Sequence, residues 1–178
     1  MIKTYLQFIN EDHKHNYGCV MLNLNIPNWR DIISNIDEED LYIDPNDDSY
    51  GLEDNPHVTV LYGLHQNIDE KVVSIINKYK YKNYNFKITG VDAFKNENYD
   101  VLKFSVQVDE SLKDFNNELS DLPNSNEYPD YKPHITIAYL KPGMADKYIN
   151  MGIEIPDLSI ESIIYSKSNG QKLIYQIY

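Results

Sequence analysis

Two short segments of the chain repeat the same order of chemically distinctive residues. "PHVTVLYG" begins at Pro56, and "PHITIAYL" begins at Pro133. In each segment the proline precedes a histidine, a β-branched residue, a threonine and a second β-branched residue, and a tyrosine follows three positions after the threonine. Chance seldom produces a match at so many positions, so we infer that both segments contribute to one site.

The first segment is predicted to be a strand with one polar and one apolar face. Side chains at positions i and i+2 of a strand share a face. The alternation therefore places His57 and Thr59 on one face and Val58, Val60 and Tyr62 on the other. The apolar face belongs in a core, which leaves the histidine and the threonine to line a polar site.

The second segment follows the same alternation. Its polar face carries His134 and Thr136, together with the small side chain of Ala138. The opposite face is predicted to consist of Ile135, Ile137 and Tyr139. One His-x-Thr strand is usually a half-exposed imidazole without a catalytic role, so the pairing of two such strands carries the prediction of a site.

Two imidazoles and two hydroxyls around one site are suited to cleaving a phosphodiester without a metal ion. Either of His57 and His134 can accept the proton of the attacking oxygen while the other donates a proton to the leaving oxygen. Histidine suits both roles because its ordinary pKa lies near neutrality. The hydroxyls of Thr59 and Thr136 can donate hydrogen bonds to the non-bridging phosphate oxygens, where charge builds up. The residue types do not assign the acid and the base to particular histidines.

Three further residues are candidates for substrate binding. Lys132 and Lys141 bracket the second segment, where a cation would balance phosphate charge, although either can equally be a solvated surface residue. Tyr17 stands just before the first predicted strand and could stack on a nucleotide base.

The remaining histidines give weaker signals. His13 and His15 have the spacing of half a metal site, but no cysteine or carboxylate cluster completes it, so a solvated loop is the favoured interpretation. His65 follows the first segment and is interpreted as a loop residue. We expect no metal site and no cofactor.

The elements that position these residues alternate between strands and helices in an α+β pattern. An acidic segment at 37–55 is expected to be a solvated loop, with a lid over the site as the alternative. The predicted strands cover 18–26, 57–62, 84–94, 99–108, 134–140, 158–166 and 172–177, and the predicted helices cover 27–36, 68–79, 110–122 and 144–151.

Composition and charge restrict the class of protein. The chain has 178 residues, which fits one domain over 1–178. Its net charge of −12 and the absence of a Lys/Arg-rich block argue against binding to long nucleic acid. No apolar run is long enough to span a bilayer, the N-terminus lacks the pattern of a signal peptide, and Cys19 is the single cysteine. We therefore expect a cytoplasmic protein with no membrane association and no obligate protein partner.

The paired motifs resemble the two signature motifs of the 2H phosphoesterase superfamily. "HVT" and "HIT" each lie on an apolar strand, and together they match the family pattern at all four motif positions. The resemblance implies two pseudosymmetric lobes of antiparallel sheet with flanking helices and a central cleft that carries both H-x-T strands. It also implies metal-independent action on 2′,3′-cyclic phosphates, oligonucleotide ends and related phosphodiesters.

The flanking residues are similar to one branch of that superfamily. "YGCVML", "YGLEDNPHVTVLYGL" and "YKPHITIAYLK" resemble segments of phage anti-CBASS proteins, which degrade the cyclic di- and trinucleotide signals of bacterial antiviral defence. The resemblance implies cleavage of 3′–5′ bonds in such signals within the cytoplasm of an infected host cell. The alternatives are an RNA 2′,3′-cyclic phosphodiesterase and, from a different class, a protein that sequesters a nucleotide without turnover.

Overall fold

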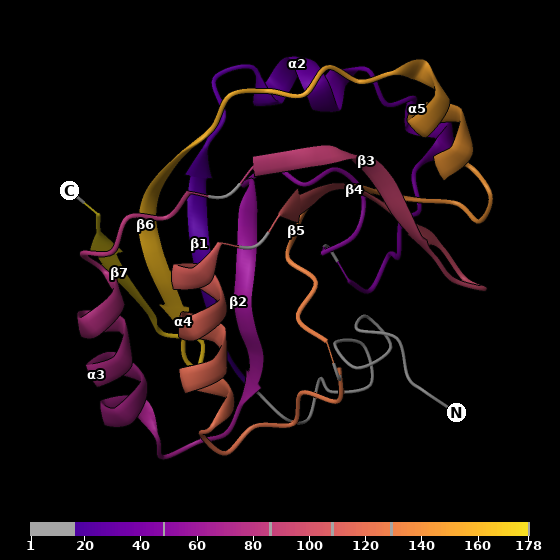
Figure 1. The fold of residues 1–178 in the computed structure, drawn as a ribbon. Helices are drawn as coiled ribbons and strands as arrows, with labels where there is room; N and C mark the ends of the chain where they lie inside the picture. Colours follow the sequence, from indigo (N-terminus) through magenta and orange to yellow (C-terminus); the bar gives the residue numbers. More distant parts are fainter. Residues whose placement is uncertain (1–16, 48, 86, 108, 129, 178) are drawn as a thin grey trace.

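Strands of the chain form two separate antiparallel sheets (Figure 1). The computed structural model describes residues 17–47, 49–85, 87–107, 109–128 and 130–177. The strands of the larger sheet are β1 (Gly18–Asn25), β2 (His57–Leu64), β6 (Ser159–Ser166) and β7 (Lys172–Gln176). The strands of the smaller sheet are β3 (Lys87–Lys95), β4 (Asp100–Gln107) and β5 (His134–Leu140). The predicted α+β fold class and each predicted strand are confirmed.

The two strands that carry the repeated motifs lie at sheet edges. The strand order is β2-β1-β6-β7 in the larger sheet and β3-β4-β5 in the smaller one. Figure 1 shows β2 and β5 next to each other at the junction of the two sheets, and residues of these two strands contact one another. Each motif strand is therefore the outermost strand of its own sheet at this junction.

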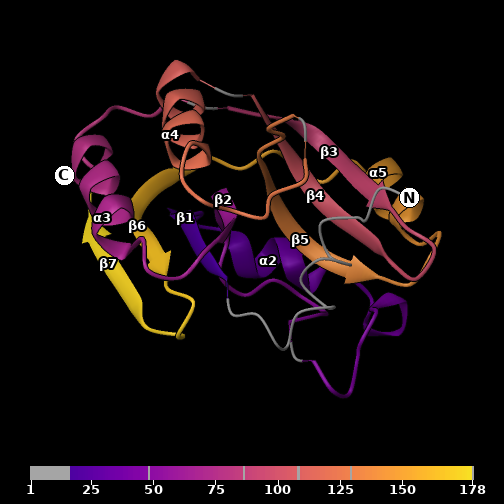
Figure 2. The ribbon, with the colours of Figure 1, turned by 90° about the horizontal axis from the view of Figure 1, so that it is seen from below.

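Helices cover the sheets and provide most of their apolar partners. Helices α3 (Asp69–Tyr79) and α4 (Glu110–Ser120) lie against one face of the larger sheet, as Figures 1 and 2 show from two directions. Helices α2 (Trp29–Ser34) and α5 (Ala145–Met151) contact the smaller sheet, and a short 3₁₀ helix, η1, covers Glu38–Asp40. No helix in the described part of the chain is long and apolar enough to cross a membrane.

The helices form where an apolar stripe has the helical period. In α4 the stripe of Leu112, Phe115 and Leu119 is fully buried. The side chain of Asp109 caps its first turn by accepting a hydrogen bond from the backbone N–H of Leu112 at 2.7 Å. Tyr79, at the end of the stripe on α3, stacks on Phe115 with ring centroids 4.7 Å apart. The helices predicted from these stripes are confirmed.

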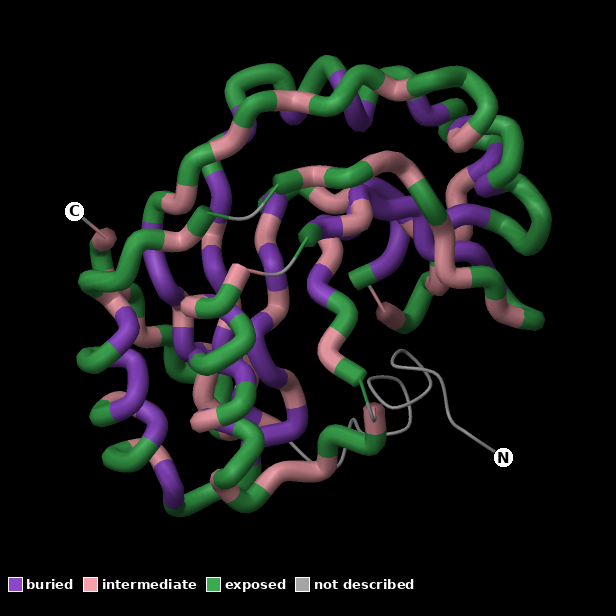
Figure 3. Tube along the Cα trace, in the orientation of Figure 1, coloured by how far each residue is buried: buried purple, intermediate pink, exposed green. Residues whose placement is uncertain are grey.

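One hydrophobic core joins the two sheets. It contains buried residues of β1, β2, β4, β5 and β6 and of the helices, and Figure 3 shows the buried positions along the facing strands. A second, smaller cluster contains Tyr50, Tyr99 and Val101, with Tyr42 and Tyr139 packed against it. The motif strands are therefore anchored from both sheets by the same apolar packing.

The acidic segment at 37–55 lies along the outer edge of β5 and is not simply a solvated loop. The backbone N–H of Tyr42 donates to the carbonyl of Tyr139 at 2.9 Å, and the N–H of Tyr139 donates to the carbonyl of Gly51 at 2.7 Å. An uncovered strand edge exposes unpaired backbone groups. The segment satisfies those groups, so this largely exposed loop also serves as the cover of the β5 edge.

Candidate active site

The first motif strand contains a β-bulge directly after its threonine. On the neighbouring strand β1, Met21 pairs with Thr59 and the adjacent Val20 pairs with Leu61. Val60 is thus an extra residue without a partner on β1. A bulge of this kind changes which face the following side chains occupy.

The second motif strand contains a bulge at the same position of the motif. On β4, Lys103 pairs with Thr136 and the adjacent Leu102 pairs with Ala138, so Ile137 is the extra residue. In both motifs the residue that follows the threonine is therefore the one that breaks the alternation.

The matched bulges bring the repeated tyrosines into the site. Tyr62 and Tyr139 line the same cavity as Thr59 and Thr136. The strict alternation predicted that both tyrosines point away from the motif histidines and threonines. That prediction was wrong because each bulge shifts the alternation by one residue. The tyrosine that follows each threonine by three positions then shares its face.

The carbonyl of each bulge residue has a hydrogen-bond donor from another segment. The buried side-chain amide of Asn116 on α4 donates to the carbonyl of Val60 at 2.7 Å. The backbone N–H of Glu53 donates to the carbonyl of Ile137 at 3.0 Å. Because buried carbonyls are costly to leave unpaired, these partners stabilise the irregular strand geometry.

The two motif histidines are held by the backbone in the same way. Nδ1 of His57 lies 2.8 Å from the carbonyl oxygen of Asn55, and Nδ1 of His134 lies 3.0 Å from the carbonyl oxygen of Lys132. A carbonyl oxygen only accepts hydrogen bonds, so each Nδ1 carries a proton. The second nitrogen, Nε2, is then the atom on each ring that can accept or donate a proton during a reaction.

The protonation of His134 is strongly affected by its surroundings. The pKa of His134 is lowered to about 4, mainly by desolvation; the hydrogen bond to the Lys132 carbonyl acts in the opposite direction, and the charges of Lys103 and His57 also contribute to the lowering. The ring also packs edge-on against Phe94, with centroids 4.9 Å apart. His134 is therefore neutral near pH 7 and can act as a base at Nε2.

A cavity of about 470 Å³ lies between the motif strands. His134 and both motif threonines line it, and its volume is within the ordinary range for small-molecule sites. His57 does not line the cavity, but it is two residues along β2 from Thr59, and its charge acts on His134. The aromatic residues of the cavity wall are Tyr62, Phe94, Tyr128, Tyr131 and Tyr139.

The segment between α4 and β5 forms one side of this cavity. Its residue Tyr131 donates a hydrogen bond from its hydroxyl to the carbonyl of Thr59 at 2.9 Å. Near the other end of β2, the N–H of Ser125 donates to the carbonyl of Gly63 at 2.9 Å. The segment is thus fastened to the first motif strand and brings Lys132 to the cavity.

The structure places the other predicted substrate-binding residues differently. Tyr17 does not line the cavity. It stacks on His65, with centroids 5.7 Å apart, and meets the ring of Tyr62 edge-on at 6.2 Å. The loop residue His65 in turn lies with Nε2 2.7 Å from the hydroxyl of Ser125. Tyr17 therefore lies behind a cavity residue, and His13 and His15 lie outside the described residues.

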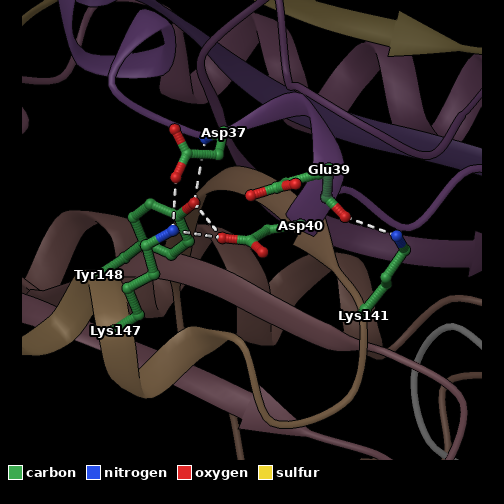
Figure 4. Close-up of polar contacts among 6 residues, drawn as sticks. All are labelled: Asp37, Glu39, Asp40, Lys141, Lys147 and Tyr148. Atoms are coloured by element: carbon green, nitrogen blue, oxygen red, sulfur yellow. Dashed lines mark hydrogen bonds and ion pairs between the residues drawn. The ribbon is translucent and has the colours of Figure 1, made fainter.

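Lys141 is not brought together with the motif residues. Figure 4 shows its ammonium group donating to the backbone carbonyl of Glu39, at 2.5 Å. Beside it, the carboxylate of Asp40 accepts hydrogen bonds from Lys147 at 2.7 Å and from the hydroxyl of Tyr148 at 2.6 Å. The hydrogen bond from Lys147 has the largest effect and that from Tyr148 the second largest, and together they hold the pKa of Asp40 below its ordinary value. Lys141 belongs to this link between η1 and the end of β5, away from the cavity.

Comparison with known proteins gives the family of the chain. A family model described as the 2′-5′ RNA ligase superfamily matches residues 29–150. A structure of Kluyveromyces marxianus Usb1 is similar with a TM-score of 0.57 and 13% identity, over 90% of this chain and 98% of that chain. A structure of the same protein with uridine monophosphate has a TM-score of 0.57 and 14% sequence identity, again over 90% of this chain and 98% of that chain. A structure of Escherichia coli LigT complexed with NADP⁺ has a TM-score of 0.46 and 16% sequence identity, over 91% of this chain and 96% of that chain. A search of curated proteins finds no match.

The matched residues make up more than half of the chain, so this chain belongs to the 2′-5′ RNA ligase superfamily, the 2H phosphoesterases. It is accordingly a phosphodiesterase of the hydrolase class. The likeness to Usb1 shows that the two proteins share a fold.

Proposed function

We propose that this phosphodiesterase cleaves the 3′–5′ bonds of small cyclic di- or trinucleotides. The observation that carries the proposal is one cavity in which a motif histidine and both motif threonines lie among five aromatic side chains. The hydroxyls suit a phosphate, and the aromatic rings suit the faces of bases. A cyclic dinucleotide presents both groups within one compact ligand.

The proposed reaction uses a hydroxyl of the substrate as the nucleophile. One imidazole takes the proton of the ribose 2′-hydroxyl as its oxygen bonds to phosphorus. The bond from phosphorus to the 5′-oxygen breaks, and the other imidazole gives that oxygen a proton. The products are a 2′,3′-cyclic phosphate and a free 5′-hydroxyl. Thr59 and Thr136 donate hydrogen bonds to the non-bridging oxygens, and the step needs no metal ion.

The resemblance of the flanking segments supports a particular biological role. "YGLEDNPHVTVLYGL" and "YKPHITIAYLK" are similar to phage proteins that counteract CBASS signalling. The proposed role is removal of a cyclic oligonucleotide signal in the cytoplasm of the infected cell. Lys132 at the cavity is the proposed cation for the phosphates. We further propose that residues 1–178 form one domain with this function.

A second candidate function is opening of 2′,3′-cyclic phosphate ends of RNA. The name of the superfamily refers to RNA, and the Usb1 structure contains uridine monophosphate. The same four motif residues suit both reactions, because each involves a phosphate beside a ribose 2′-oxygen. The two functions differ in whether the cavity accepts a complete cyclic dinucleotide.

One competition experiment separates these functions. The protein is incubated in EDTA with a 3′3′-linked cyclic dinucleotide, its 2′-deoxy form and an RNA oligomer that ends in a 2′,3′-cyclic phosphate. We expect cleavage of the cyclic dinucleotide, binding without cleavage of the deoxy form, and slow action on RNA. Preferential opening of the RNA end would favour the second function, and tight binding without any turnover would indicate sequestration. Complete loss of activity in EDTA, restored by a metal ion, would contradict the metal-independent mechanism.

A further inference from the structure

The two motif histidines have electrostatically opposite neighbours, although their motifs match. The neighbour of His134 is Lys103, which lies in the middle of β4 and is only 4% exposed. Its ammonium group lies 3.3 Å from a carboxylate oxygen of Asp92 and donates to the hydroxyl of Ser105 at 2.8 Å. A lysine is rarely buried so fully unless its charge is paired, and this one is held in a fixed place.

Lys103 lies on the same side of the smaller sheet as the second motif. It pairs directly with Thr136 across β4 and β5, and the next pair on that face is Ser105 with His134. Directly opposed residues of antiparallel strands project on the same face. The ammonium group lies over the ring of Phe94, 4.5 Å from its centroid, and the ring of His134 lies perpendicular to that same ring with centroids 4.9 Å apart. A fixed positive charge at this position disfavours a second one on His134.

The neighbour of His57 is the carboxylate of Glu53. One of its oxygens, Oε2, lies 4.0 Å from Nδ1 of His57, and the other accepts a hydrogen bond from the N–H of Asn55 at 3.0 Å. The backbone of Glu53 is held at both ends. Its N–H donates to Ile137, and its carbonyl accepts from the indole N–H of Trp29 at 2.7 Å. A carboxylate is therefore fixed beside His57, whereas an ammonium group is fixed near His134.

We propose that Lys103 and Glu53 determine the direction of proton transfer, with His134 as the base and His57 as the acid. The proposal rests on the phosphodiesterase function given above. Nε2 of His134 takes the proton from the attacking hydroxyl, and Nε2 of His57 gives its proton to the leaving oxygen. Lys103 and Glu53 act through the histidines and do not touch the substrate, so they are positioning residues.

The charged groups around each ring fix the sign of the expected effects. Lys103 of β4 and His57 of β2 face His134, and Asp92 of β3 partly balances Lys103. Glu53 of the preceding loop and His134 of β5 face His57. Replacing Lys103 with a neutral residue removes a repulsion, so the pKa of His134 rises. Replacing Glu53 with a neutral residue removes the negative charge beside His57.

The test follows the imidazole resonances by NMR as the pH is changed, without substrate. The variants are Lys103→Met, Lys103→Arg and Glu53→Gln, and Lys113→Met, an exposed lysine of α4, is the matched control. We expect Lys103→Met to raise the pKa of His134. Lys103→Arg should behave as wild type because it keeps the charge, and Lys113→Met should shift neither ring.

The second readout is the pH profile of kcat/KM, measured with the substrate that the protein cleaves in the competition experiment described above. Lys103→Met should move the acid limb to higher pH, with a loss of roughly threefold at pH 5, and Glu53→Gln should move the alkaline limb to lower pH. If Glu53→Gln moves the acid limb, or Lys103→Met leaves His134 unchanged, the proposal is overturned. If Lys103→Met does not fold, the pH profile of Glu53→Gln tests the proposal by itself, because Glu53 is partly exposed. The titration needs no substrate, so its failure is distinct from a failure of the proposed function.

Discussion

At the scale of single residues, the two histidines combine identical local restraint with different surroundings. Each Nδ1 is held by a carbonyl two residues earlier, which fixes the ring and leaves Nε2 to exchange protons. We predict that His57→Ala and His134→Ala each lower kcat by about 10²–10⁴, the usual contribution of general acid–base catalysis. Single-turnover assays measure the loss, and circular dichroism checks that each variant is folded. Activity near that of wild type in either variant would exclude a two-histidine mechanism.

The low pKa of His134 also predicts how stability depends on pH. The unfolded chain binds a proton at this residue near its ordinary pKa of 6.5, but the folded protein does so only near 4. Protons therefore favour the unfolded chain as the pH falls from 6.5 towards 4, and stability is lost over that range. We expect the loss to be smaller in His134→Ala than in wild type by about 1–3 kcal/mol. Urea unfolding at a series of pH values measures it, and parallel curves for the two proteins would contradict the prediction.

At the scale of elements, the matched bulges depend on partners from distant segments. Asn116 on α4 is a donor to the carbonyl of Val60, so Asn116→Ala removes this buried hydrogen bond. We predict a loss of about 1–3 kcal/mol in the free energy of unfolding. We also predict a lower kcat, because Thr59 and Tyr62 flank the bulge. The control is Asn117→Ala, whose exposed side chain is adjacent on the same helix. Equal stability of the two variants would show that the bulge does not need this hydrogen bond.

At the scale of the whole molecule, net charge is predicted to select the substrate by size. A surface with a net charge of −12 repels an extended polyanion, whereas a cyclic dinucleotide brings only two phosphates to the cavity. Salt screens this repulsion. We therefore expect the KM for an RNA oligomer to fall as salt is raised, while the KM for a cyclic dinucleotide changes little. Steady-state assays at low and high salt test this, and a KM for RNA that rises with salt would indicate a basic binding track.

Much of the fold and the centre of the site could be predicted from the sequence. Helical stripes such as Leu112, Phe115 and Leu119 and the alternation of the strands are local patterns, so they predicted the elements without knowledge of their partners. The repetition of His-x-Thr, at His57 and His134, predicted two matching strands. These features were accessible because each depends on residues that are near one another in the chain.

Only the tertiary structure decided which face of each motif strand carries the tyrosine and which charges lie beside the motif histidines. The period of two predicted that Tyr62 and Tyr139 point away from the site, but each bulge exists only in register with a neighbouring strand and reverses their direction. The repeated tyrosine was a signal of this, although its meaning required the pairing. Lys103 gave no signal, because its charge acts through space on His134, which is distant in the chain. Glu53 lies only four residues before His57, but only the structure shows that its carboxylate lies beside that ring. Lys141 is adjacent to the second motif in sequence, yet the end of β5 directs it to Glu39 instead of the cavity.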